Sequence, residues 1–154
     1  MDKVITVKQL NKSCGECTAC CSGLLSGVAH GHVFYPGRPC FFKAKSGCSI
    51  YEDRPESPCK SYQCGYLIHP FVPEWMRPDQ CGVIATPRIH SYKDGEETKY
   101  IQYLQLSEYK PPMSAVTLWW FVERYLDGSI PNLLITLNGG SQRLGTAEFF
   151  KASL

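Results

Sequence analysis

Eight of the nine cysteines of this 154-residue chain lie between residues 14 and 64. Half of them stand in one run, Cys14-Gly15-Glu16-Cys17-Thr18-Ala19-Cys20-Cys21. Two cysteines separated by two residues can place both sulfurs on one side of a tight turn, at about 2.3 Å from a shared soft metal. The spacing therefore predicts that cysteines bind metal. The candidate ligands are Cys14, Cys17, Cys20, Cys21, Cys40, Cys48, Cys59 and Cys64.

The length and composition bear on how these cysteines are used. A chain of 154 residues with 44% hydrophobic residues fits a single domain, 1–154, and can form an apolar core without covalent cross-links. Its first residues lack the apolar stretch of a signal peptide, and no run is long enough to span a membrane. We expect a cytoplasmic protein, and in a reducing compartment clustered cysteines indicate metal or redox chemistry. A disulfide framework is the alternative, which an odd number of cysteines suits poorly.

The net charge of +2 is too small to indicate a polyanionic partner. Nucleic-acid binding through a basic face would need lysines and arginines gathered in one place, and the lysines of this chain are only loosely grouped. We therefore do not expect nucleic acid as a partner.

The trio Cys14, Cys17 and Cys20 matches the first three positions of the bacterial ferredoxin run that binds iron–sulfur clusters. The fourth position differs, because Cys21 follows Cys20 directly and adjacent side chains diverge. Cys21 is thus expected to serve a second site or a structural or chemical role. Thiolates bind both Zn²⁺ and iron, and the match of the trio to the ferredoxin run slightly favours a [4Fe–4S] cluster. Eight ligands permit one site or two sites of four.

Several other residues near the cysteines are weaker candidates. His30 and His32 form a His-x-His pair that can bind a transition metal, although beside eight thiols a surface or hydrogen-bonded pair is expected. Cys81, outside the cluster, is expected to be a free buried thiol. Arg54 can hydrogen-bond sulfur or an anionic ligand, but an ion pair with a neighbouring carboxylate, Glu52 or Asp53, is the expected use.

Ser57 and Pro58 predict the start of a helix, with Ser57 as its cap and Pro58 at its first position. Cys59 and Cys64 would lie five residues apart on this helix, which is a poor spacing for one face. Either the helix is short, or these two cysteines point to different places.

The second half of the chain, 82–154, is predicted to form an α+β scaffold. Few of its residues indicate a chemical function. Two β-rich stretches, 83–92 and 100–106, flank the turn Lys93-Asp94-Gly95 and predict an antiparallel hairpin, whose first strand Pro87 makes an edge or bulged strand. A buried helix is expected over 113–127 and a core strand over 133–137. Shorter elements are expected at Val4–Val7 (a strand), 138–140 (a turn) and 147–154 (a helix).

The fold class predicted is α+β. A loop-rich, cysteine-ligated metal-binding half, 14–68, packs on a small antiparallel sheet with a buried helix.

The pattern of cysteines and their neighbours resembles the CxxCxxCC (YkgJ-like) cysteine-cluster family of zinc- or iron-chelating domains. The resemblance covers about residues 14–68, and the segment 77–79 also looks like one seen in some members. It is carried by Cys14-x2-Cys17-x2-Cys20-Cys21, Pro39-Cys40, the stretch from Gly47 to Pro55, and Cys59-x4-Cys64. The resemblance implies that the eight cysteines bind metal or an iron–sulfur cluster. Flagellin lysine methylases carry a similar pattern, which implies a possible methyl-transfer or modification activity.

Two functions follow as hypotheses. The first is a metal-binding protein that holds zinc or an iron–sulfur cluster through the eight cysteines. The alternative is a metal- or cluster-dependent enzyme that modifies a protein or peptide by methyl transfer or redox chemistry. The four scattered histidines support no Ser/His/Asp arrangement, so no catalytic residue is identified.

Overall fold

The computed structural model describes residues 14–62, 64–69, 72–109, 113–137 and 140–154. The strand predicted at Val4–Val7 lies outside the described residues, and so do positions 138 and 139 of the predicted turn. Within the described ranges the fold is a mixture of short helices and small sheets, which confirms the α+β prediction.

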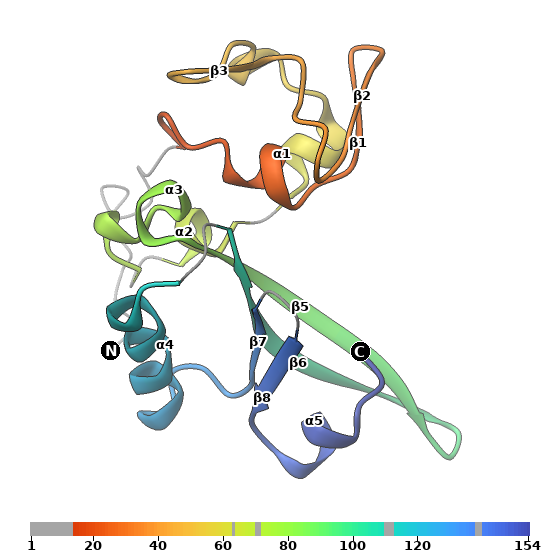
Figure 1. Cartoon of the computed structure of the whole chain (residues 1–154). Helices are drawn as coiled ribbons and strands as arrows, with labels where there is room; N and C mark the ends of the chain where they lie inside the picture. Colours follow the sequence, from red (N-terminus) through yellow and green to blue (C-terminus); the bar gives the residue numbers. More distant parts are fainter. Residues whose placement is uncertain (1–13, 63, 70–71, 110–112, 138–139) are drawn as a thin grey trace, which may run out of the picture.

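The cysteine-rich half contains only short elements, drawn in red to yellow at the top of Figure 1. Two small antiparallel hairpins and three helical turns are joined by loops. The elements are α1 (Ala19–Gly23), β1 (Gly27–Ala29), β2 (His32–Phe34), β3 (Lys43–Ala44), β4 (Gly47–Cys48), η2 (Tyr51–Asp53) and η3 (Glu56–Lys60). The prediction of a loop-rich first half is confirmed.

Three further short elements lie between the cysteine-rich half and the sheet (Figure 1). They are α2 (Gly65–Ile68), η4 (Glu74–Met76) and α3 (Pro78–Cys81). Each of these elements is a single helical turn of three or four residues.

A four-stranded sheet forms the scaffold, in the order β5 (Val83–Asp94), β6 (Glu97–Glu108), β7 (Leu133–Leu137) and β8 (Gly140–Leu144). The β5–β6 and β7–β8 pairs are antiparallel, whereas β6 and β7 are parallel. The predicted antiparallel sheet is found in the β5–β6 and β7–β8 pairs, and the parallel β6–β7 pair makes the whole sheet mixed. Helix α4 (Ala115–Leu126) connects β6 to β7, and a crossover of this length is what a parallel pair requires.

The predicted hairpin is confirmed. Asp94 pairs with Glu97 at its end, and Gly95 has the positive φ of 64° that an Asp-Gly turn favours. Pro87 does not interrupt the strand, because β5 continues through it and Pro87 lies opposite Leu104. Proline is tolerated there because β5 is the edge of the sheet, as predicted.

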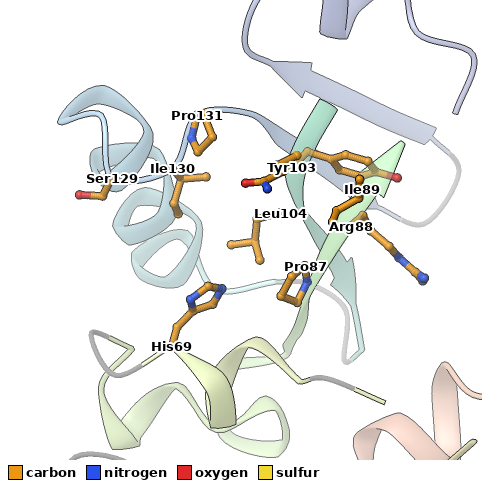
Figure 2. A pocket seen from close by; sticks show the side chains of 10 residues that line it. His69, Pro87, Arg88, Ile89, Tyr103, Leu104, Ser129, Ile130 and Pro131 are labelled. Carbon is orange, nitrogen blue, oxygen red and sulfur yellow. The ribbon is translucent and has the colours of Figure 1, made fainter. Parts of the chain in front are cut away.

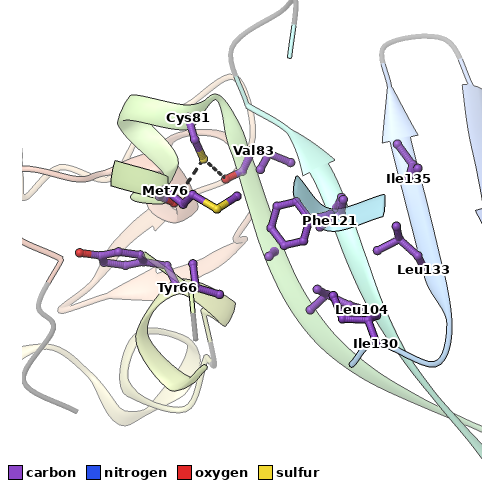
Figure 3. Close-up of a cluster of buried hydrophobic side chains, with 12 residues drawn as sticks. Tyr66, Met76, Cys81, Val83, Leu104, Phe121, Ile130, Leu133 and Ile135 are labelled. Atoms are coloured by element: carbon purple, nitrogen blue, oxygen red, sulfur yellow. Dashed lines mark hydrogen bonds between the residues drawn. The ribbon is translucent and has the colours of Figure 1, made fainter. Parts of the chain in front are cut away.

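Side chains alternate between the two faces of the sheet, and each face has its own apolar cluster. On the first face, residues of β5, β6 and β7 pack with Phe121 of α4 and with Tyr66 and Met76 (Figure 3). On the opposite face, Phe149 packs against Ile101 and Leu134. Phe149 belongs to α5 (Ala147–Lys151). The N-cap of this helix is Thr146, whose hydroxyl accepts a hydrogen bond from the Phe149 amide.

Helix α4 is less buried than its sequence predicts. Thr117 and Phe121 are buried, but Val116, Trp119 and Leu126 are each more than half exposed. An apolar sequence allows a helix to be buried on all sides, but burial also requires neighbouring elements on all sides. Helix α4 packs on the sheet with one face, so its other face stays exposed.

The start of β5 joins the scaffold to the cysteine-rich half. The Tyr62 hydroxyl lies 2.7 Å from the Thr86 hydroxyl. Gly65 approaches β5 so closely that a Cβ there would lie 2.7 Å from the Ala85 carbonyl oxygen. Among the described residues, no helix is long and apolar enough to cross a membrane.

Candidate metal centre

All eight predicted ligands line one or both of two small neighbouring hollows. The first hollow is lined by seven of them: Cys14, Cys17, Cys20, Cys21, Cys40, Cys48 and Cys59. The second is lined by Cys14, Cys17, Cys20 and Cys64. Three thiols are shared, so the hollows lie side by side. The nine cysteines all belong to the described part of the chain, and none of them is in a disulfide.

Separate short elements bring these thiols together. The amide of Cys17 donates to the Cys14 carbonyl at 2.8 Å, which closes the first turn, and Cys20 and Cys21 follow on α1. The Cys40 amide donates to the Cys21 carbonyl at 3.4 Å, which ties the next loop to this helix. Cys48 ends β4, Cys59 lies on η3, and Cys64 precedes α2. The cluster is therefore a tertiary arrangement rather than one local motif.

Gly47 allows two of these loops to meet. Its φ is +115°, which residues with a side chain rarely adopt, and a Cβ at this position would collide with the Gly15 carbonyl oxygen. Gly15 lies between Cys14 and Cys17, and Gly47 precedes Cys48. The close contact of these two backbones holds Cys48 beside the first turn.

Cys59 and Cys64 point to different hollows, as their spacing allowed. Cys59 lines only the first, and Cys64 only the second. The predicted helix start is wrong in its details, since η3 is a single turn whose N-cap is Pro55 and in which Ser57 is extended.

The thiols of the cluster are perturbed mainly by burial. Burial raises the pKa of Cys17 to about 11 and also raises the pKa values of Cys40 and Cys59. A hydrogen bond between the adjacent thiols, followed by burial, raises the pKa of Cys20, and the same bond lowers that of Cys21 to about 7. Cys17, Cys20, Cys40 and Cys59 thus stay neutral near pH 7 until a cation arrives to stabilise their thiolates.

Basic and aromatic side chains complete the walls of the hollows. Lys43 and Arg54 line the first hollow, and Arg77 lines the second. The Arg77 side chain is held by two hydrogen bonds to the Asp79 carboxylate, at 2.6 and 2.8 Å. These cations can offset the negative charge that bound thiolates would bring.

The prediction that Arg54 forms an ion pair with a neighbouring carboxylate is wrong. Among the described residues, Arg54 pairs with neither Glu52 nor Asp53. Instead its guanidinium stacks 3.8 Å from the centroid of the Tyr51 ring, and its Nε donates to the Tyr51 carbonyl at 2.7 Å. The Tyr51 hydroxyl in turn donates to the Cys14 sulfur at 3.9 Å.

Sequence reasoning gave no role to Lys43, Tyr51 or Arg77. A local signal for the first two existed, because each stands three residues after a predicted ligand, Cys40 or Cys48. Arg77 is distant from every ligand in sequence, and its one signal is the similarity of segment 77–79 to a segment seen in some members of the CxxCxxCC family.

The remaining candidates lie outside the hollows. His30 Nε2 is 2.8 Å from the Asp53 carbonyl oxygen, and the His32 ring stacks on Phe41 with 4.0 Å between centroids. Cys81 is buried, and its thiol donates to the carbonyls of Met76 and Val83 at 3.2 and 3.5 Å (Figure 3). The prediction of a free buried thiol at Cys81 is confirmed.

The donor set suits a thiophilic metal, since thiolates bind zinc and iron–sulfur clusters. The hollows have volumes of about 50 and 20 Å³. A space of roughly 10–15 Å³ accommodates a water molecule, so each hollow has room for at least one ion. Within the described ranges, no three Cys, His, Asp or Glu side chains are already arranged as ligands of one ion. Such geometry commonly forms together with the bound metal.

A wider cavity of about 350 Å³ lies on the scaffold (Figure 2). Leu104 of β6, Pro87 of β5 and Ile130 contribute apolar walls, and His69 stands at one side, whereas Arg88 projects away from the centre. No cysteine lines this cavity. The larger space and the thiol chemistry are therefore in different places.

Comparisons of the chain with protein families, with curated proteins and with solved structures give no match.

Proposed function

We propose that this chain is a metal-binding protein that holds its metal through eight cysteines: Cys14, Cys17, Cys20, Cys21, Cys40, Cys48, Cys59 and Cys64. The observation that supports this function is the convergence of thiols from separate segments on two adjoining hollows. The proposal agrees with the resemblance to the CxxCxxCC family. It implies a reducing compartment such as the cytoplasm, where these thiols stay unpaired.

The electrostatics favour a bound cation. Burial holds the pKa of Cys17 at about 11, so this thiol keeps its proton near pH 7 unless a cation stabilises its thiolate. A thiophilic metal displaces their protons and binds the thiolates. Lys43, Arg54 and Arg77 then face sulfur that carries negative charge.

Two kinds of metal centre suit this donor set. The trio Cys14, Cys17 and Cys20 favours a [4Fe–4S] cluster, for which Cys64 supplies a fourth thiol at the same hollow. The small volumes favour single Zn²⁺ ions, because a cluster of eight atoms requires the sulfurs to move apart. In either case the group is held by the same cysteines.

The deciding experiment is anaerobic purification followed by an absorption spectrum and elemental analysis. A brown protein with a broad band near roughly 400 nm, iron and acid-labile sulfide contains a cluster. A colourless protein with stoichiometric zinc contains zinc sites. A purified protein that has neither metal and takes up neither under reducing conditions would refute the proposal.

The second candidate is a metal- or cluster-dependent enzyme that modifies a protein or peptide. The observation in its favour is the presence of Lys43 and Arg54 beside the thiols of the first hollow, where two cations can hold an anionic group of a substrate. Single Cys→Ser variants that keep their metal but lose a measured modification activity would support the enzyme over the binding module.

A further inference from the structure

We infer that the eight cysteines form two separate four-cysteine sites, each for one thiophilic divalent cation such as Zn²⁺. The inner site consists of Cys14, Cys17, Cys20 and Cys64. The outer site consists of Cys21, Cys40, Cys48 and Cys59. This inference rests on the proposed function and adds to it a partition of the ligands.

The lining of the hollows gives the partition. The second hollow is lined by four thiols, which are those of the inner site. The other four thiols line the first hollow and do not reach the second. Four thiolates are a complete set of ligands for a tetrahedral ion, so each group is sufficient by itself.

Backbone contacts link three of the outer cysteines. The Cys40 amide donates to the Cys21 carbonyl at 3.4 Å, and the Lys43 amide donates to the Cys40 carbonyl at 3.0 Å. Lys43 in turn pairs with Cys48 in the β3–β4 hairpin, so Cys21, Cys40 and Cys48 are joined through this loop.

The backbone also places two of the inner cysteines together. The Cys17 amide donates to the Cys14 carbonyl at 2.8 Å, which closes the turn that carries both thiols. The boundary between the two sites falls between Cys20 and Cys21. These two are neighbours in sequence on α1, where consecutive side chains point about 100° apart, so they can serve different ions.

The two sites also have different surroundings. The inner hollow has walls of Tyr66, Leu67 and Ile84, of which Tyr66 belongs to the core cluster and Leu67 packs against it. The outer hollow is bounded by loop residues such as Ile50 and Pro55 and by the cations Lys43 and Arg54. A four-thiolate zinc site carries two negative charges, which these two cations balance.

The test loads the full-length chain with Zn²⁺ under anaerobic, reducing conditions and measures zinc per chain. The matched variants are Cys59→Ser for the outer site and Cys64→Ser for the inner site, with Cys81→Ser as the control. We expect two ions in the unmodified chain and in the control, one in each single variant, and none in the double variant. If either single variant loses both ions, or the unmodified chain holds one ion shared by both sets, the partition is wrong.

A second measurement avoids variants that fold poorly. The unmodified chain loaded with ¹¹³Cd²⁺ is expected to give two cadmium resonances of equal intensity, both in the range of four-sulfur coordination. A single resonance at saturation would overturn the two-site arrangement while leaving the proposed metal binding intact. A chain that binds neither Zn²⁺ nor Cd²⁺ would instead refute the proposed function itself.

Discussion

The Tyr51 hydroxyl donates a hydrogen bond to the sulfur of Cys14, 37 residues away in sequence. The Tyr51 ring is held from the other side by the guanidinium of Arg54, 3.8 Å from its centroid. Because a donor beside a thiolate stabilises its negative charge, we expect Tyr51 to support Cys14 as a ligand of the proposed metal without binding the metal itself.

We expect Tyr51→Phe to weaken Zn²⁺ binding roughly 10-fold, since groups that hydrogen-bond to ligands typically contribute 10- to 100-fold and this contact is long. Competition with a chromophoric chelator measures the change. Tyr100→Phe is the matched control, because Tyr100 is 68% exposed on β6. Equal affinities for the two variants would show that the Tyr51 hydroxyl has no part in the site.

Gly47→Ala is expected to destabilise the cysteine-rich half. The positive φ alone costs about 1–3 kcal/mol for a residue with a side chain, and the added Cβ also collides with the Gly15 carbonyl. Gly37→Ala is the control, because Gly37 has a similar φ of +100° but open space around it. Urea unfolding at equal Zn²⁺ concentration should show the larger loss in free energy of unfolding for Gly47→Ala. Equal losses in the two variants would mean that the contact between the two loops contributes nothing to stability.

The sequence predicted features that depend on local patterns. Asp94-Gly95 between two β-rich stretches was enough for the β5–β6 hairpin, and Pro87 was enough to predict an edge or bulged strand, which the structure shows to be an edge. The eight cysteines could be named as a set because their spacing is itself the signal. The spacing of Cys59 and Cys64 also showed that they need not share a face.

Features that depend on distant contacts could not be predicted in this way. The parallel pairing of β6 with β7 is decided by where α4 packs, and nothing in either strand encodes it. The exposed side of α4 depends on what the rest of the fold leaves uncovered. The placement of Arg54 on Tyr51, rather than on an adjacent carboxylate, follows from the walls of the first hollow.

The metal-free protein is expected to lose stability in alkaline solution. The pKa of Cys17 is about 11 in the fold, raised by burial from an ordinary value of 9.0. Its folded state therefore keeps the proton longer than the unfolded state does. The stability that this thiol contributes is fully present below pH 9.0 and is lost as the pH rises to about 11.

Urea midpoints of the metal-free protein across this pH window measure the loss. Cys17→Ser should reduce the fall of the urea midpoint with rising pH. A smaller fall of the midpoint should remain, because burial also raises the pKa values of Cys40 and Cys59. A midpoint that stays constant or rises between pH 9.0 and about 11 would contradict the assigned direction of the shift.

Removal of metal is expected to unfold the first half while the sheet stays folded. Between residues 14 and 62 the described core contributes few buried apolar side chains, Ala19, Ala29 and Phe34, whereas the sheet has clusters on both faces. Structural zinc sites supply roughly 10–16 kcal/mol of apparent binding free energy, which becomes folding free energy in a region with so small a core.

Hydrogen exchange before and after chelation locates the effect. Amides of residues 14–62 should lose protection, and those of β5, β6 and β7 should keep most of theirs. Phe121→Ala supplies the converse control, because it removes about 3–5 kcal/mol from the sheet cluster without touching a thiol. In the Phe121→Ala variant, the amides of the scaffold should therefore be the first to lose protection. Unchanged protection over 14–62 in chelated protein would mean that the loops fold by themselves, and the cysteines would then have no structural dependence on metal.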